Sequence, residues 1–463
     1  MRGALLPQTR LHVPPKEAVF KHAGHKDLGA CILAWLEQKY GADLAARKRD
    51  VLAQLQAARM EAVKAAGQGG KSLTTREALR SLLSWYHVLA ELDLPFGLDE
   101  SKGLLRVRFE YCQALATAKM TKSYTPQLER AATLFNAAAV LSAQASEQSD
   151  ARRAGAGGGE PWKVQCHTFR AAAGLFHHIR DEFFPAELAA ADSALTEDLS
   201  AAGLDCFAAL MLAQAQECFF EQASEQGMSL AIRAKVCAGT AKCYADASKA
   251  AGHRQLVDAQ RIVRTYCAFV QRYFAMQAEL LTATQLLAEH EKSGSGIGRA
   301  IQYLRAVAAQ QPEARAALSA WTKLVTEAKA DWHLQRMTAQ ETEVGKLLAE
   351  AEKDNSEIYY EPVSDGAAPP VEAKVFVTPL DPEESEDYTA CNPHEEEGVE
   401  PALRELARGV ARLSRPLELE AEWSAATMLR SGLGFFVPSF LLFSLVVAGH
   451  SRRWIADRRR VCC

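Results

Sequence analysis

The chain has 463 residues, of which 48% are hydrophobic and 24% are charged, a balance typical of a folded globular protein rather than a disordered one. Its formal net charge of −4 gives no overall indication of nucleic-acid binding. Good helix formers such as alanine, leucine, glutamine and glutamate are abundant and alternating β-branched runs are scarce, so the expected fold class is all-α.

In the N-terminal part, we expect helices that alternate with irregular segments. Prolines punctuate residues 1–30, which are expected to be irregular. A capping box formed by Thr74 and Glu77 marks the start of one helix. Residues 102–119 contain RVRFEYCQALA, which has strand character before the pattern turns helical. Helical patterns are also expected at about 28–40, 44–66 and 124–148.

A glycine-rich loop at 154–161 precedes a long succession of helical patterns. These patterns cover residues 162–184, 185–201, 204–223, 228–251, 253–292 and 297–328. From residue 228 onward they are typical of long antiparallel hairpins packed one on the next, as in a solenoid without a fixed sequence repeat. Residues 358–380 are rich in proline, and we expect them to lie extended over the helical body.

The remaining residues form two further regions. Residues 381–430 are expected to form an acidic linker with one short helix, and residues 431–463 a membrane-directed segment. Within the latter, SGLGFFVPSFLLFSLVVAG is a run of 19 uncharged residues at 431–449, close to the shortest length that spans a bilayer. The run is apolar on every side and contains Pro438, which argues against a soluble core helix.

Two geometries remain open for this C-terminal region. The apolar run could be a membrane anchor. Alternatively, it could be a re-entrant or interfacial segment whose following arginines lie on anionic lipid, with Cys462 or Cys463 acylated or prenylated. The other cysteines of the chain's 11 form no CxxC pair, and we expect free thiols in a reducing compartment. The first residues contain no signal peptide, so we expect the body of the protein in the cytosol.

The sequence offers no convincing catalytic or metal-binding motif. GQGGKS at 67–72 has the wrong spacing for a phosphate-binding loop, because Ala65 stands where the first glycine is required. His177 and His178 are adjacent rather than four residues apart, so they do not share one metal easily. We therefore expect a protein that is not an enzyme and that has no cofactor and no small-molecule substrate.

Four segments of the chain resemble one known family. They are LERAATLFNAAAVLSAQASEQ (128–148), FRAAAGLFHHIRDEFF (169–184), LMLAQAQECFFEQASEQGMSLAIRAKV (210–236) and DNSEIYYEPV (354–363). In this order and at these separations they are similar to the BRO-one domain, which is shared by Alix, Brox and the rhophilins. The resemblance covers roughly residues 5–380, and we expect this domain to occupy residues 1–380.

The resemblance implies a curved, banana-shaped helical solenoid around a tetratricopeptide-like core. It also implies a small strand element early in the chain and an extended C-terminal segment packed back along the body. Members of the family bind the C-terminal amphipathic helix of the core ESCRT-III filament subunit in an exposed apolar groove, where a few apolar anchors carry most of the binding energy.

Several groove residues are implied by position in the family motifs. Phe219 matches the aromatic wall of the groove, and Ile232 and Val236 match its floor. Lys163 matches a basic residue that pairs with acidic groups on the bound helix, and Phe376 matches a further apolar contact. For the apolar positions, plain core packing is the alternative interpretation.

Two positions depart from the family pattern, and one further position matches it. Gly159 stands where the family has an acidic residue, so one polar contact is expected to be lost. Val236 replaces a longer aliphatic residue and trims the groove slightly. Tyr359 matches a family tyrosine that can be phosphorylated, which makes it a candidate modification site.

The hypothesis from the sequence is therefore a membrane-associated ESCRT adaptor that acts in endosomal sorting or membrane remodelling. Its expected partners are the C-terminal helix of the core ESCRT-III subunit and a membrane contacted by residues 431–463, without nucleic acid. The alternative is a signalling scaffold, in a Rho-type or pH-sensing protease complex, that uses the same domain for another partner.

Overall fold

The structure is a computed structural model, and its description covers residues 10–11, 13–14, 16, 18, 27–67, 74–92, 105, 107–116, 119–123, 125–153, 161–183, 196–325 and 327–382. All of them belong to a compact unit that spans residues 1–408, and a second unit spans residues 409–463. The predicted acidic linker from residue 383 onward, the apolar run at 431–449, Cys462 and Cys463, and also Gly159, lie outside the described residues.

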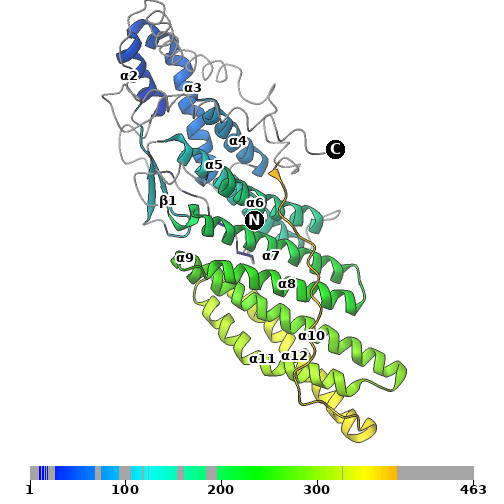
Figure 1. The fold of residues 1–463 in the computed structure, drawn as a ribbon. Coiled ribbons are helices and arrows are strands. Elements are labelled where there is room, and N and C mark those ends of the chain that lie inside the picture. Colours follow the sequence, from blue (N-terminus) through cyan, green and yellow to red (C-terminus); the bar gives the residue numbers. More distant parts are fainter. Residues whose placement is uncertain are drawn as a thin grey trace, which may run out of the picture. The chain divides into compact units, whose positions relative to one another are not determined.

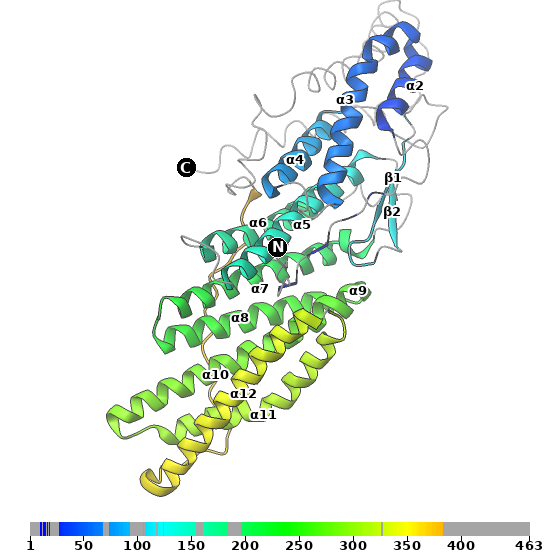
Figure 2. The same cartoon turned by 180° about the vertical axis from the view of Figure 1, so that it is seen from behind.

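The described part is all-α, as predicted. Its longer helices are α2 (Leu28–Tyr40), α3 (Ala42–Gly67), α4 (Thr75–Glu91), α5 (Pro126–Arg153), α6 (Pro161–Phe183), α7 (Ala201–Glu225), α8 (Leu230–Ala251), α10 (Thr265–Ser293), α11 (Ile297–Thr322) and α12 (Glu327–Asp354). Each of them packs on the next along the chain, with α8 packing on α10, so that they form a helical solenoid (Figures 1 and 2). None of these described helices combines the length and apolar content that a bilayer crossing requires.

The cores of the central helices consist of small residues around a few aromatic rings. Alanines of α5 and α6 are fully buried and allow the helix axes to approach closely. Phe135 of α5 contacts Phe176 of α6 and Phe207 of α7, with ring centroids 5.3 and 5.7 Å apart. These rings join three successive helices into one packed layer.

The predicted strand element is a hairpin. Strand β1 (Phe109–Cys112) pairs antiparallel with β2 (Met120–Ser123), and Ala18 forms a bridge with Tyr111 at its other edge. Between the two strands the chain reverses, and the backbone N–H of Gln113 donates to the Lys119 carbonyl (2.8 Å). All four residues of β1 are buried, although its sequence alternates as in a half-exposed strand: the polar Glu110 between Phe109 and Tyr111 is also buried and forms an ion pair with Arg108 (2.6 Å).

Most predicted helices are confirmed, and the differences occur at breaks. The capping box at Thr74 is present in full. The helix predicted for 253–292 begins later, at Val257, and continues without a break to Ser293 through α9 (Val257–Ala259), a π-helical turn (Gln260–Arg264) and α10. The described end of the helix predicted for 185–201 is instead a 3₁₀ turn, η2 (Glu197–Leu199). Helix α12 is absent from the predicted elements.

Residues 360–380, called the strap below, run extended over the helices, as predicted. The strap follows the π-helical turn η4 (Asn355–Tyr359) and crosses the solenoid from α11 to α6, against the order of the chain (Figure 1). At its start, the Glu361 carboxylate accepts hydrogen bonds from the Gly296 and Gly298 amides (2.7 and 2.9 Å) at the N-terminus of α11. At its end, the Leu380 amide donates to the Arg170 carbonyl of α6 (3.1 Å).

Three helical glycines allow this close approach. A Cβ atom on Gly298, Gly239 or Gly174 would lie 2.6, 1.9 or 1.7 Å from a strap carbonyl oxygen. Real side chains do not tolerate such distances, so these helices can carry no side chain at the three crossing points. The strap therefore lies with its backbone directly on α11, α8 and α6.

Candidate functional site: an apolar surface at the α7–α8 turn

The site is built around the turn that joins α7 to α8. Each helix begins at a serine cap: the Ser200 hydroxyl accepts from the Gly203 amide (3.0 Å), and the Ser229 hydroxyl from the Ile232 amide (3.4 Å). Gly227 has a φ of 62° in the tight connection between the helices, a conformation that glycine adopts without strain. This geometry places the last turn of α7 beside the first turn of α8.

A row of three aromatic rings crosses this part of the molecule. The Phe219 ring of α7 lies 6.4 Å from the Trp162 ring of α6 and 5.5 Å from the Phe376 ring of the strap, between centroids. Phe376 is 53% exposed, and Trp162 and Phe219 are half-buried. Three elements far apart in sequence thus present one aromatic row to the solvent.

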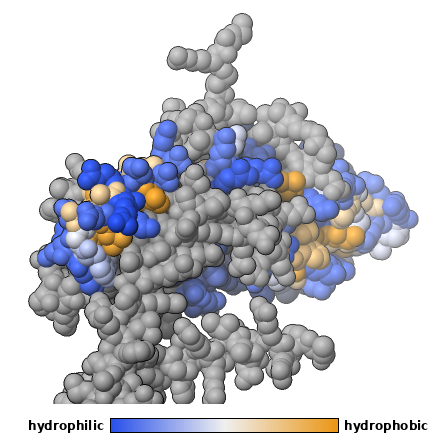
Figure 3. Space-filling model, turned by 90° about the horizontal axis from the view of Figure 1, so that it is seen from above, coloured by the Kyte–Doolittle hydropathy of each residue, from blue (hydrophilic) through white to orange (hydrophobic). Residues whose placement is uncertain are grey.

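Aliphatic side chains extend the row. Ile232, in the first turn of α8, is 49% exposed, an unusual state for an isoleucine within a helix. The apolar surface, as we call it below, is defined by this residue and the aromatic row; the same helices, their connection and the strap also carry the exposed Val164, Met228 and Val375. Figure 3 shows from above that the described surface is mostly hydrophilic, with apolar residues gathered in a few areas. An exposed apolar cluster of this kind is typical of an interaction site.

Basic side chains border the apolar surface. Lys163 is exposed next to Trp162, and Lys374 is exposed beside Val375. Lys235 of α8 forms an ion pair with Glu372 of the strap (2.5 Å), and this hydrogen bond lowers the pKa of the Glu372 carboxyl. The arrangement favours a ligand with an apolar face and acidic flanks.

The predicted site residues occupy different positions in this arrangement. Phe219 and Phe376 are in direct ring contact, Ile232 is exposed on the adjoining helix, and Lys163 follows Trp162. Val236 is only 4% exposed, so it lies beneath the surface rather than on it.

Tyr359 belongs to another part of the molecule. It lies in η4, 41% exposed, with its ring 4.2 Å from that of the buried His290. Trp162, by contrast, belongs to the aromatic row and was missed in the sequence. The sequence feature that could have indicated Trp162 is its place at the second position of a predicted helix, directly after a glycine-rich loop.

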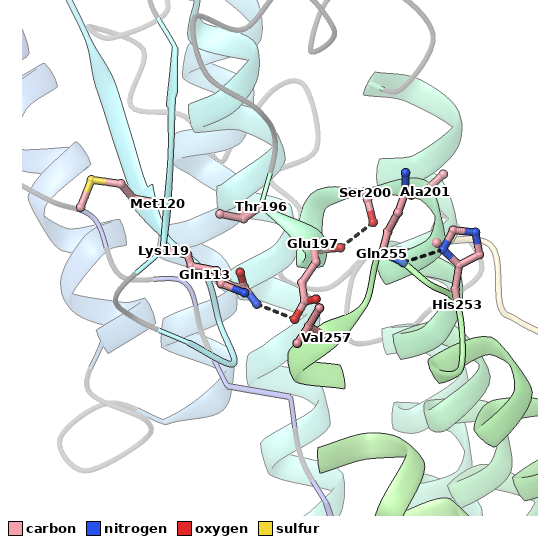
Figure 4. Close-up of a pocket in the computed structure, with 11 residues that line it drawn as sticks. Gln113, Lys119, Met120, Thr196, Glu197, Ser200, Ala201, His253, Gln255 and Val257 are labelled. Carbon is pink, nitrogen blue, oxygen red and sulfur yellow. Dashed lines mark hydrogen bonds between the residues drawn. The ribbon is translucent and has the colours of Figure 1, made fainter. Parts of the chain in front are cut away.

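A hollow lies elsewhere in the molecule, where the β-hairpin approaches the start of α7 and the loop after α8 (Figure 4). It has a volume of about 740 Å³, and its polar groups are largely engaged with one another. The Gln113 amide nitrogen donates to both Glu197 (2.6 Å) and Asp258 (3.0 Å), and Lys119 forms an ion pair with Asp258 (2.9 Å). Burial raises the pKa of Glu197, whereas the Lys119 ion pair lowers that of Asp258. This network ties the hairpin to the helices.

The described side chains offer little for catalysis. They contain no group of three histidine, cysteine or acidic residues able to hold a metal ion. Burial raises the pKa of Cys218 to about 11 and those of Cys166 and Cys206 to about 12, so these thiols stay protonated at neutral pH.

Comparisons with known proteins match the chain to one domain family. A family model described as the BRO1-like domain matches residues 17–404. The vacuolar protein-sorting protein bro1 of Aspergillus fumigatus is 29% identical over 309 residues, which cover 67% of this chain and 28% of that protein. The human programmed cell death 6-interacting protein is 24% identical over 360 residues, covering 74% of this chain and 36% of that protein. The chain thus spans well under half the length of these curated relatives.

Solved structures share the fold. The structure titled "ALIX BRO1 CHMP4C complex" is similar with a TM-score of 0.60 and 23% identity, covering 82% of this chain and 97% of that one. The structure titled "Structure basis for endosomal targeting by the Bro1 domain" has a TM-score of 0.63 and 16% identity, covering 87% of this chain and 99% of that one. At this identity the likeness shows the fold, and it confirms the helical solenoid that the resemblance implies.

Proposed function

The chain belongs to the BRO1-like domain family, and on that premise we propose that it is an ESCRT-associated adaptor whose apolar surface binds the C-terminal helix of an ESCRT-III subunit. The observation that carries the proposal is the aromatic row of Trp162, Phe219 and Phe376 beside the half-exposed Ile232. A related domain has been solved in a complex titled with an ESCRT-III subunit, CHMP4C. The relatives named for vacuolar protein sorting support a role in endosomal sorting.

The physical fit is that of an amphipathic helix against a partly apolar wall. Such a ligand presents anchors at i, i+3, i+4 and i+7, and the exposed side chains of the apolar surface offer contacts for them. Aromatic residues that lose water on binding contribute most of the energy in interfaces of this type. The exposed Lys163 and Lys374 would pair with acidic residues on the flank of the bound helix.

A membrane contact completes the proposal. Residues 431–463 would hold the adaptor at an endosomal or related membrane, through the apolar run and through lipid on Cys462 or Cys463. Local concentration at the membrane then lets a modest affinity for the ESCRT-III helix suffice. Flotation of the full chain with anionic vesicles, before and after Cys462→Ser and Cys463→Ser, tests this part; a chain that stays in the soluble fraction in every case would refute it.

The binding test uses the full chain and a fluorescent peptide of the CHMP4C C-terminal helix, followed by anisotropy. Ile232→Asp and Phe219→Asp place a charge in the apolar surface and should each weaken binding by about 30-fold or more, the loss of a typical hot spot. Val257→Asp is the matched control, because Val257 is 64% exposed on α9, outside the apolar surface. Equal binding by the parent and Ile232→Asp would show that this surface is not the site.

A further inference from the structure

Phe376 supplies one end of the aromatic row, yet it belongs to the strap and not to a helix. Its ring contacts Phe219 and is 53% exposed, so the ring contact alone does not bury it. Residues of an extended segment have no helical hydrogen bonds to hold them. The position of the ring must therefore be set by what holds the strap backbone at this point.

Gln216 of α7 binds the strap backbone before and after Val375. Its side-chain nitrogen donates to the Lys374 carbonyl (2.9 Å), and its side-chain oxygen accepts from the Phe376 amide (2.9 Å). Gln216 has no exposed surface, and both polar ends of its amide are used in this grip. It lies one helical turn before Phe219, so it places Phe376 next to the ring that Phe376 contacts.

Helix α8 binds the same part of the strap. The Lys374 amide donates to the Lys235 carbonyl (3.0 Å). Gly239 leaves room for the Lys374 carbonyl, and a Cβ there would also lie 3.2 Å from the Gln216 side-chain nitrogen. The peptide groups around Val375 are thus fixed between α7 and α8, at the point where both helices adjoin the apolar surface.

We propose that Gln216 is a positioning residue that holds Phe376 in the apolar surface, so that partner affinity depends on the docked strap. The inference rests on the proposed function and deepens it, because Gln216 is buried and acts through the strap rather than by touching the partner. Without Gln216, the Lys374 carbonyl and the Phe376 amide each lose a partner, and the ring is free to leave Phe219. The partner would then meet an incomplete aromatic row.

The test compares Gln216→Leu with Gln302→Leu in the full chain. Gln302 makes the same kind of contact, since its side-chain nitrogen donates to the Gly366 carbonyl of the strap (2.9 Å), but ten residues before Phe376. Gln216→Leu should weaken binding of the CHMP4C helix peptide by about tenfold, the loss of one anchor. Gln302→Leu should bind as the parent does. Equal affinities of the parent and Gln216→Leu would overturn the proposal.

Two further readouts separate positioning from general damage to the fold. Amide hydrogen exchange at residues 372–378 should accelerate in Gln216→Leu and not in Gln302→Leu, while α7 and α8 stay protected. In a Phe376→Ala background, Gln216→Leu should weaken binding little further, because it acts through the ring that is already absent. A full additional loss there would overturn the assignment.

The outcome for the proposed function is distinguishable from the outcome for Gln216. If the parent does not bind the peptide, the proposed function fails. Hydrogen exchange of the strap alone then tests whether Gln216 holds residues 372–378. Unchanged exchange of the strap in Gln216→Leu overturns the role of Gln216, and accelerated exchange confined to the strap supports it.

Discussion

Two segments outside the helices are tied to them by hydrogen bonds, and they differ in burial and in charge. The N-terminal segment, described at residues 10, 11, 13, 14, 16 and 18, is held by buried charges, whereas the strap lies on the surface with most of its side chains exposed. Both are gripped by an amide side chain. Asn136 of α5 binds the amide and carbonyl of Lys16 (2.7 and 3.2 Å), much as Gln216 binds the strap.

The charges make the difference. Lys16 forms an ion pair with Asp198 (2.7 Å), and neither side chain has any exposed surface. Arg10 contacts Glu221 (3.0 Å) and is equally buried. In the strap, by contrast, the ion pair between Lys235 and Glu372 is open to solvent on both sides. The difference shows that the first segment is part of the core, while the second is a surface element, as the binding role proposed for it requires.

The largest expected effect is that of Lys16→Met. The variant leaves the Asp198 carboxylate buried without its cation, which typically costs about 3–5 kcal/mol of folding free energy. Urea unfolding of the full chain measures it. A loss below about 1 kcal/mol, the value of a surface pair, would remove the distinction between the two segments.

Alkaline pH should also act on the N-terminal segment. Cys218 lies under Arg10 (3.3 Å), and burial raises the pKa of its thiol to about 11. The folded chain therefore retains this proton where the unfolded chain loses it. The contribution of the protonated Cys218 thiol to folding stability is fully present below about pH 9 and is lost as the pH rises toward 11. It amounts to about 1.4 kcal/mol per unit of difference between the folded and unfolded pKa.

Urea unfolding as a function of pH tests this expectation, with Cys218→Ala as the control that lacks the thiol. The fall in stability between pH 9 and 11 should be shallower in Cys218→Ala. Identical slopes in the two proteins would contradict the assignment.

Gly239→Ala tests the strap. The added methyl group would collide with the Lys374 carbonyl, and the strap would have to move away from α8. Because this part of the strap is exposed, we expect a modest loss of stability of about 1 kcal/mol, together with weaker peptide binding. The pair of measurements is decisive: unchanged peptide affinity would separate the strap from the binding site.

The smallest effect is expected for Lys235→Ala. Its ion pair with Glu372 is exposed and screened by salt, so its loss should change stability by under about 0.5 kcal/mol. Thermal unfolding at low and high salt checks this. A large loss would show that the strap is held by charge, like the N-terminal segment.

The fold was predictable because long helices are visible in their apolar periodicity, and the family motifs located Phe219 and Ile232. Other features depend on contacts between distant segments. Lys16 lies in a segment that is irregular by its prolines, and nothing local shows that its charge is buried. In the sequence, Gly239 is only a poor helix former within a helical pattern. The close approach of the Lys374 carbonyl of the strap explains why this position is a glycine. Trp162 joins the site only through the packing of α6 on α7.

Amide hydrogen exchange of the full chain, with and without the CHMP4C helix peptide, tests the proposed binding site most directly. We expect new protection at the end of α7, the start of α8 and residues 372–378, with no change at Val13 and Lys16, whose backbone amides are hydrogen-bonded to buried side chains. Protection at α9 and the β-hairpin instead, with the strap unchanged, would contradict it.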